Sequence, residues 1–144
     1  MAIKLGMNCV LYYGTAGSQA DTEAENVKDL TLTLEKSDTD VTTRGNDGWR
    51  ATLGTLKDAT IEFEAIWDSD DAFFTALQTA YFDGTSIALL ALNAAIAESG
   101  AEGLDADFTI TNLSRNENLE EAVTASITAK PTYSTRAPSW HTTS

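Results

Sequence analysis

The stretch that decides the fold runs from Val27 to Trp67 and reads VKDLTLTLEKSDTDVTTRGNDGWRATLGTLKDATIEFEAIW. Its two ends alternate strictly between apolar and polar residues, which is the period-2 pattern of a strand with one buried face. Both ends, Val27–Glu35 and Lys57–Trp67, are therefore predicted to be antiparallel strands. The side chains expected to face the core are Leu30, Leu32 and Leu34 in the first strand, and Ala59, Ile61, Phe63, Ala65 and Trp67 in the second.

Further strands are predicted elsewhere in the chain. Ile87–Leu92 is short and apolar throughout, which favours a strand covered on both faces. Two later segments alternate again, with Phe108 and Ile110, and then Val123, Ala125 and Ile127, on the core side. These two segments are Asp105–Leu113 and Ala122–Ala129, and the remaining predicted strands are Cys9–Tyr13 and a short one at Trp49–Leu53.

One segment has helical spacing instead. Phe73, Phe74, Leu77, Ala80 and Tyr81 recur at intervals that place them on one face of a helix. A helix is expected over residues 69–82, with Ser69 as its N-cap and Gly84 as its stop. The sequence thus predicts a single, mainly β domain over residues 1–144, a barrel or sandwich of antiparallel strands with one flanking α-helix.

Two segments are predicted to be irregular. Residues 37–49 connect the two decisive strands and end in the turn signal Asn46-Asp47-Gly48. A connection of this length is usually either functional or disordered. Residues 131–144 are rich in Pro, Ser and Thr and are expected to form a C-terminal arm.

Composition excludes several classes of function. The chain has 22 acidic and 9 basic residues, and its net charge of −13 repels phosphate backbones, which disfavours ordinary nucleic-acid binding. The lone Cys9 forms neither an internal disulfide nor a structural zinc site. The most apolar stretch, Ile87–Ile96, is too short to span a bilayer, so neither a membrane span nor a secretion signal is expected.

No catalytic constellation stands out. Glu62 and Glu64 could be read as a pair of catalytic carboxylates, but their alternation predicts a solvated or interface face, without the desolvation that catalysis requires. His141 is the single histidine and has no second histidine with which to form a metal site. Phosphate-binding loops, nucleophile elbows and calcium loops are missing from the sequence. We therefore expect no enzyme, no cofactor and no metal.

Several motifs resemble a known family. VKDLTLTLE at residues 27–35, DVTTRG at 40–45 and GWRATL at 48–53 continue through LKDA at 56–59 and Glu62-Phe63. Together they are similar to the major tail tube proteins of long-tailed, siphovirus-like phages, and the similarity runs from about residue 5 to residue 140. The resemblance implies the tail tube fold, which the tube protein of type VI secretion systems shares.

The resemblance also implies an assembly. Six subunits would form a ring, and rings would stack into a hollow tube that conducts viral DNA, in a virion tail assembled in the host cytoplasm. Tape-measure protein and a tail terminator would be partners besides the chain itself. Residues 37–49 would be the loop that reaches the neighbouring ring, and terminal arms such as 131–144 would bridge subunits. The residues expected at the inter-ring contact are Asp40, Val41, Thr42, Thr43, Arg44 and Trp49.

In such a tube the net negative charge of the chain would act on the DNA that passes through it. Six times −13 gives −78 per ring, and acidic groups on the lumen wall would repel DNA phosphates, so that DNA passes without specific binding. The polar faces of the two decisive strands are the candidates for this wall. They carry Thr31, Thr33, Glu35, Glu62 and Glu64.

Three alternatives remain open at this point. A tail terminator or head-to-tail connector has a related fold and forms one ring that does not stack. A soluble carbohydrate-binding β-sandwich would be a monomer with a platform of exposed aromatic side chains. Within the loop, Trp49 could simply begin a strand and fill the core instead of contacting another ring.

Overall fold

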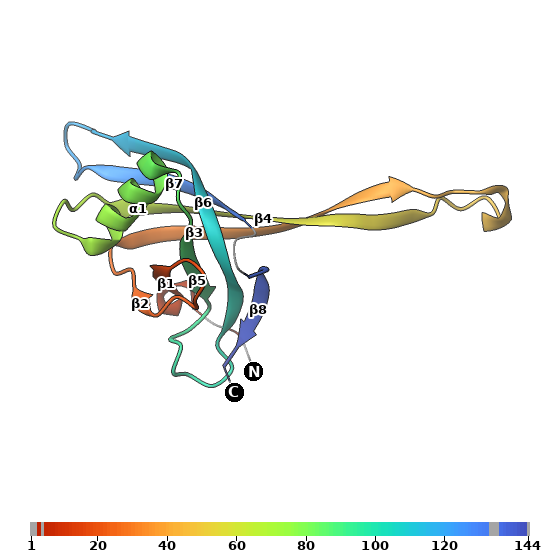
Figure 1. The fold of residues 1–144 in the computed structure, drawn as a ribbon, viewed down its shortest axis with the longest axis horizontal. Coiled ribbons are helices and arrows are strands. Elements are labelled where there is room, and N and C mark those ends of the chain that lie inside the picture. The colour runs from red at the N-terminus through yellow and green to blue at the C-terminus, as the bar shows by residue number, and fades with distance from the viewer. Residues whose placement is uncertain (1–2, 4, 133–135, 144) are drawn as a thin grey trace.

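The computed structural model describes residues 3, 5–132 and 136–143, and within them the chain is mainly β (Figure 1). The strands form one antiparallel sheet in the order β2-β1-β5-β6-β7-β4-β3, with β8 also paired to β6. The described elements are η1 (Gly6–Asn8), β1 (Val10–Thr15), β2 (Thr22–Glu23), β3 (Val27–Asp40), η2 (Arg44–Asn46), β4 (Thr52–Ile66), α1 (Ala72–Asp83), β5 (Ile87–Leu92), β6 (Glu102–Asn116), β7 (Thr124–Pro131) and β8 (Ser139–Thr142).

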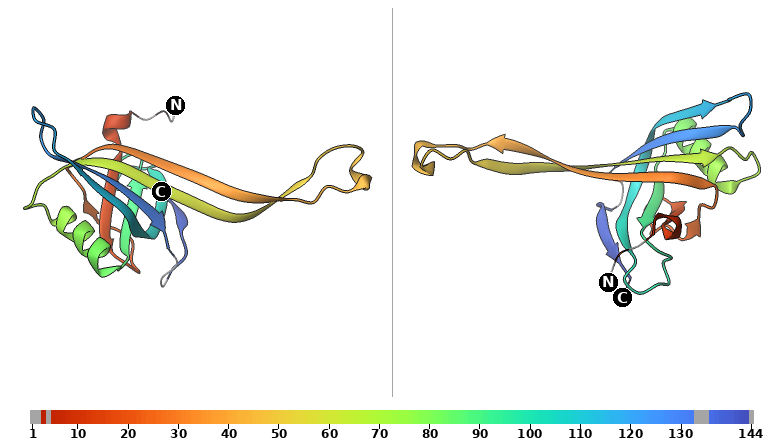
Figure 2. Two further views of the ribbon diagram at one scale, coloured as in Figure 1. Left: turned by 90° about the horizontal axis from the view of Figure 1, so that it is seen from above. Right: turned by 180° about the vertical axis from the view of Figure 1, so that it is seen from behind.

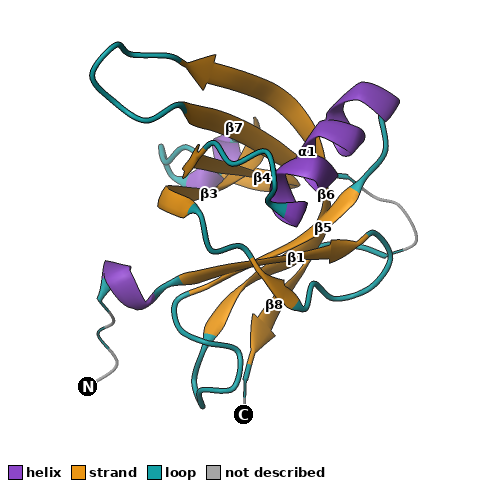
Figure 3. Cartoon of the chain, turned by 90° about the vertical axis from the view of Figure 1, so that its left-hand side faces the viewer, coloured by secondary structure: helices purple, strands orange, loops and turns teal. Residues whose placement is uncertain are grey.

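Strand β6 organises the sheet because its two halves have different neighbours. Its first half pairs with β5 from Gly103 to Phe108, and its second half pairs with β7 from Phe108 to Asn116. The sheet curls around this strand into an open half-barrel (Figure 3). The predicted fold class, mainly β with one flanking helix, is confirmed.

Helix α1 packs on the inner face of the curl and closes the main core. Phe73 stacks against Phe63 of β4, with 5.8 Å between ring centroids, and Leu77 is fully buried. The helix begins later than predicted because Asp71, and not Ser69, accepts the capping hydrogen bond from the amide of Phe73. The expected stop at Gly84 is confirmed by its left-handed φ of 68°. Tyr81 was expected in the core but is 45% exposed.

A second, smaller core covers the opposite face of β5. Leu90 and Leu92 pack there with Tyr12, whose hydroxyl accepts a hydrogen bond of 3.0 Å from the amide of Ile96. Every residue of β5 is buried. The prediction that Ile87–Leu92 is covered on both faces is therefore confirmed.

The two decisive strands are much longer than predicted. Their pairing continues to Asp40 opposite Thr52, so the predicted short strand at Trp49–Leu53 is wrong, and the irregular connection shrinks from 37–49 to residues 41–51. The apolar face of β4 is buried as expected, but Leu30 and Leu34 of β3 are 36% and 57% exposed. They are left partly uncovered on β3, which is an edge strand and has a neighbouring strand on one side only among the described residues.

The C-terminal segment is not wholly irregular either. Part of the predicted arm, 133–135 and 144, lies outside the described residues, but Ser139–Thr142 pairs with β6 as β8. Arg136 lies between two buried carboxylates of β6, at 2.8 Å from Asp105 and 3.1 Å from Asp107. Burial opposes its charge, but these hydrogen bonds more than offset burial and raise the pKa of Arg136 above its usual value. This ion-pair cluster fastens the segment to the chain's own sheet.

Candidate functional site

The most distinctive feature is a hairpin arm, which we define as residues 34–58. It is the part of β3 and β4 that continues past the rest of the sheet, since β4 pairs with β7 only from Ile61 onward. Two views show it projecting from one side of the body (Figure 2). No residue of the arm is buried. The arm therefore has no packing partner among the described residues, and a two-stranded ribbon with no core is at best marginally stable in water.

The end of the arm has a defined conformation of its own. Thr42 accepts a hydrogen bond of 2.8 Å from the amide of Ala51 and donates its hydroxyl to the carboxylate of Asp40. Val41 donates its amide to the carbonyl of Ala51 at 3.0 Å. Asp47 and Gly48 both have positive φ, at 54° and 83°, which confirms the predicted turn.

The carboxyl of Asp40 reports on this conformation. The hydrogen bonds from the hydroxyl and the amide of Thr42 hold the pKa of Asp40 below its ordinary value. Because the pKa is lowered, the hydrogen bonds to the Asp40 carboxylate stabilise the folded arm fully at pH values above the ordinary pKa. This stabilisation is lost as the pH falls through the lowered pKa. We expect Thr42→Val, which keeps only the amide, to raise the pKa of Asp40 in an NMR titration. An unchanged titration would show that the hydroxyl has no such role.

All six residues predicted at the inter-ring contact lie at this end of the arm. Trp49 is 78% exposed and Val41 is 44% exposed. Arg44 forms no ion pair within the described residues. The alternative that Trp49 fills the core is therefore wrong. An exposed indole and an exposed guanidinium within the same turn are typical of a surface that contacts a partner.

The five residues predicted to line a lumen also come together. The register sets Thr31 opposite Glu62 and Thr33 opposite Thr60, and residues directly opposite each other share a face of the sheet. Two carboxylates that sequence reasoning missed, Asp29 opposite Glu64 and Asp58 opposite Glu35, complete this acidic face. On the neighbouring strand β7 it continues into the hydroxyls of Ser126 and Thr128.

Sequence reasoning also missed the apolar side chains of the arm. Leu34, Leu53 and Leu56 are 57%, 58% and 77% exposed. Alternation predicted the orientation of Leu34 alone among these three, and it carried no signal that the other described residues would leave these side chains exposed. Leu53 is opposite Thr39 in the register, on the other face of the ribbon from Leu34, so the arm exposes apolar side chains on both of its faces.

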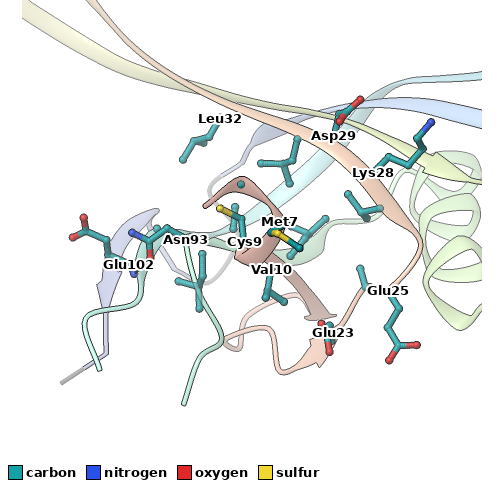
Figure 4. A pocket seen from close by; sticks show the side chains of 18 of the residues that line it. Met7, Cys9, Val10, Glu23, Glu25, Lys28, Asp29, Leu32, Asn93 and Glu102 are labelled. Carbon is teal, nitrogen blue, oxygen red and sulfur yellow. Dashed lines mark hydrogen bonds between the residues drawn. The ribbon is translucent and has the colours of Figure 1, made fainter. Parts of the chain in front are cut away.

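A groove lies at the base of the arm, between β1 and β3 (Figure 4). Its volume is about 870 Å³. Its floor is apolar, with Val10, Leu11, Leu32 and Leu92. Carboxylates surround this floor, and they belong to Glu23, Glu25, Asp29 and Glu102. Each of the four acidic side chains is exposed.

Neither a metal centre nor a membrane span is found among the described residues. No group of three or more His, Cys, Asp or Glu side chains there is placed to hold a metal ion. No helix in the same part of the chain is long and apolar enough to cross a membrane. The candidate functional surfaces are thus the arm, the acidic face and the groove.

Comparison with solved structures shows the same fold in particles with tails. The chain is similar to one from the tail of an empty gene transfer agent particle with C6 symmetry, with a TM-score of 0.76 and 18% identity over 96% of this chain and 99% of that one. It is similar to the SPP1 tail tube, with a TM-score of 0.71 and 13% identity over 90% and 76% of the two chains. It is also similar to a chain of the anti-feeding prophage baseplate, with a TM-score of 0.67 and 6% identity over 99% of this chain and 98% of that one.

The sequence itself identifies the family. No curated protein matches the chain by sequence. The family described as phage tail tube protein matches residues 5–132, which include the arm, the helix and every strand except β8. Since this match covers most of the chain, the protein belongs to the phage tail tube family.

Proposed function

We propose that six copies of this chain form a ring, that rings stack into a tube, and that the arm joins one ring to the next. As a member of its family the chain is a structural subunit of a phage tail tube, located in the tail of the virion. The observation that carries the proposal is the arm, whose apolar side chains no other part of the described chain covers. A copy in the adjacent ring would supply the missing cover.

The free edge of β3 supports lateral association in the same way. Among the strands that the structure describes, β3 pairs only with β4, so one side of its backbone from Val27 to Asp40 has no strand neighbour there. A long edge strand of this kind is a template for pairing with another chain. Neighbouring copies in a ring would complete the sheet and form a continuous wall around the bore.

The acidic face would line that bore. Of its carboxylates only Asp58 has an ion-pair partner among the described residues, Lys130 at a loose 3.9 Å. The remaining negative charge would repel DNA phosphates at short range and let DNA slide without specific binding. In this role the chain has no catalytic step, and tape-measure protein and a tail terminator are its expected further partners.

The lumen role predicts a charge effect on ejection. We expect Glu62→Lys with Glu64→Lys to leave tubes intact but to slow DNA ejection severalfold, because cationic groups in the bore attract phosphates. The matched control is Glu120→Lys with Glu121→Lys, which makes the same charge change on an exposed turn. Ejection from phages carrying either pair can be timed by DNA-dye fluorescence. Equal, normal rates would remove the acidic face from the lumen.

Negative-stain electron microscopy of the purified protein tests the proposal against its two alternatives. A tube subunit gives stacked filaments of uniform width, whereas a terminator or head-to-tail connector gives single rings. A carbohydrate-binding sandwich gives neither and elutes as a monomer in size-exclusion chromatography. Single rings at concentrations that support tail assembly would refute stacking, and a persistent monomer would refute both ring-forming roles.

A further inference from the structure

The arm and the body differ sharply in charge. The arm carries four of the nine basic residues and five of the 22 acidic ones, which gives it a net charge of −1. The other residues of the chain then have a net charge of −12. Two copies of so acidic a body repel each other, and the arm is the segment that can approach a second body with the least repulsion.

The basic residues of the arm have positions that suit such an approach. Lys36 and Lys57 are directly opposite each other on the face that also holds Leu34, whereas Glu35 and Asp58 are opposite each other on the other face. Arg44 and Arg50 are exposed on the two sides of the turn. None of these four cations makes an ion pair within the described residues. Like charges directly opposite in a sheet are unfavourable unless an anionic partner approaches.

The lining of the groove is acidic and apolar, which complements the basic and apolar residues at the end of the arm. Glu23, Glu25, Asp29 and Glu102 surround its apolar floor, and Lys28 is the single cation among its lining residues. The close-up shows these side chains arrayed around the opening (Figure 4). Its volume of about 870 Å³ falls within the range that accommodates a ligand of several hundred daltons. One indole with a guanidinium beside it is smaller than that.

We propose that this groove is the receptor for the end of the arm of a second copy in the adjacent ring, which rests on the stacking role proposed above. Trp49 enters over the apolar floor, and Arg44 and Arg50 pair with the carboxylates at its edge. The chain's own Trp49 cannot occupy it, because the arm projects away from the body (Figure 2). At about 3.3 Å per residue, the seven strand residues Leu34–Asp40 alone place the turn about 23 Å from the rest of the sheet.

Charge reversal and rescue test this pairing. The tip variant is Arg44→Glu with Arg50→Glu, and the groove variant is Glu23→Lys with Glu25→Lys. We expect each to raise the critical concentration for tube formation at least 10-fold, measured by sedimentation, with unchanged circular dichroism. Combining the two is expected to bring the critical concentration back to within about 3-fold of the original. The matched control adds Glu120→Lys and Glu121→Lys to the tip variant, which restores net charge without restoring the pairing, and should not rescue.

The outcomes separate the receptor from the stacking role. If the tip variant fails to assemble while the groove variant assembles normally, the groove is not the receptor, and stacking through the arm still stands. Two defective variants with no rescue, or rescue by the control as well, also overturn the pairing. If the tip variant itself assembles normally, both the receptor and the proposed inter-ring contact at the arm are wrong.

Discussion

Shortening the arm is expected to abolish tube formation while leaving the subunit folded. Lys36 and Lys57 are directly opposite each other in the register, so replacing residues 37–56 by Asn-Gly closes the hairpin with a two-residue turn. No buried side chain is removed. We expect the critical concentration for assembly to rise more than 100-fold, because the deletion removes the exposed side chains of Leu53, Leu56 and Trp49 together.

The melting temperature of this variant should stay within about 5 °C of the original, since neither core cluster is touched. A control replaces only Asn46-Asp47-Gly48 by Gly-Asn-Gly, which changes the turn and keeps both strands. Tubes of ordinary length and critical concentration from the shortened chain would show that the arm is dispensable for stacking.

The buried ion-pair cluster around Arg136 is expected to give the largest effect on stability. The side chain of Arg136 is 20% exposed, against 10% for Asp105 and 0% for Asp107. The substitution Arg136→Met leaves two carboxylates in a low-dielectric environment without their cation, which lowers the free energy of unfolding by about 3–5 kcal/mol. For a chain of this size the melting temperature should fall by roughly 10 °C. Thermal denaturation followed by circular dichroism measures this directly.

The chain offers a matched control in Arg115. It pairs with Glu117 at 3.1 Å, a distance equal to that between Arg136 and Asp107, but the two side chains are 51% and 62% exposed. Solvent screens a pair of this kind, so Arg115→Met should cost less than about 1 kcal/mol. Comparable losses from the two variants would mean that burial of the cluster does not set its contribution.

Local periodicity explains what could be predicted from the sequence. Alternation around Ile61 and Phe63 gave the buried face of β4 and, with it, the opposite acidic face. It could not show that Leu30 and Leu34 are uncovered, because a pattern of apolar residues gives the direction of a side chain and not the identity of its neighbour. Whether the cover comes from the same chain or from another is decided in the assembled fold.

The missed strand segments have a different cause. Asp38, Asp40 and Gly54 are poor strand formers, and the pairing across the hairpin holds them in the ladder despite their low propensity. Strand β8 was missed because its position depends on Arg136 meeting Asp105 and Asp107, about 30 residues earlier in the chain. Long-range contacts of this kind leave no periodic signal in the sequence.

A cryo-electron-microscopy reconstruction of the assembled protein tests the central claim most directly. We expect stacked rings of six copies, with Glu62 and Glu64 facing an open bore and each arm crossing into the neighbouring ring. Rings in which the arm stays against copies of the same ring, or a wall that turns its acidic face outward, would contradict the account.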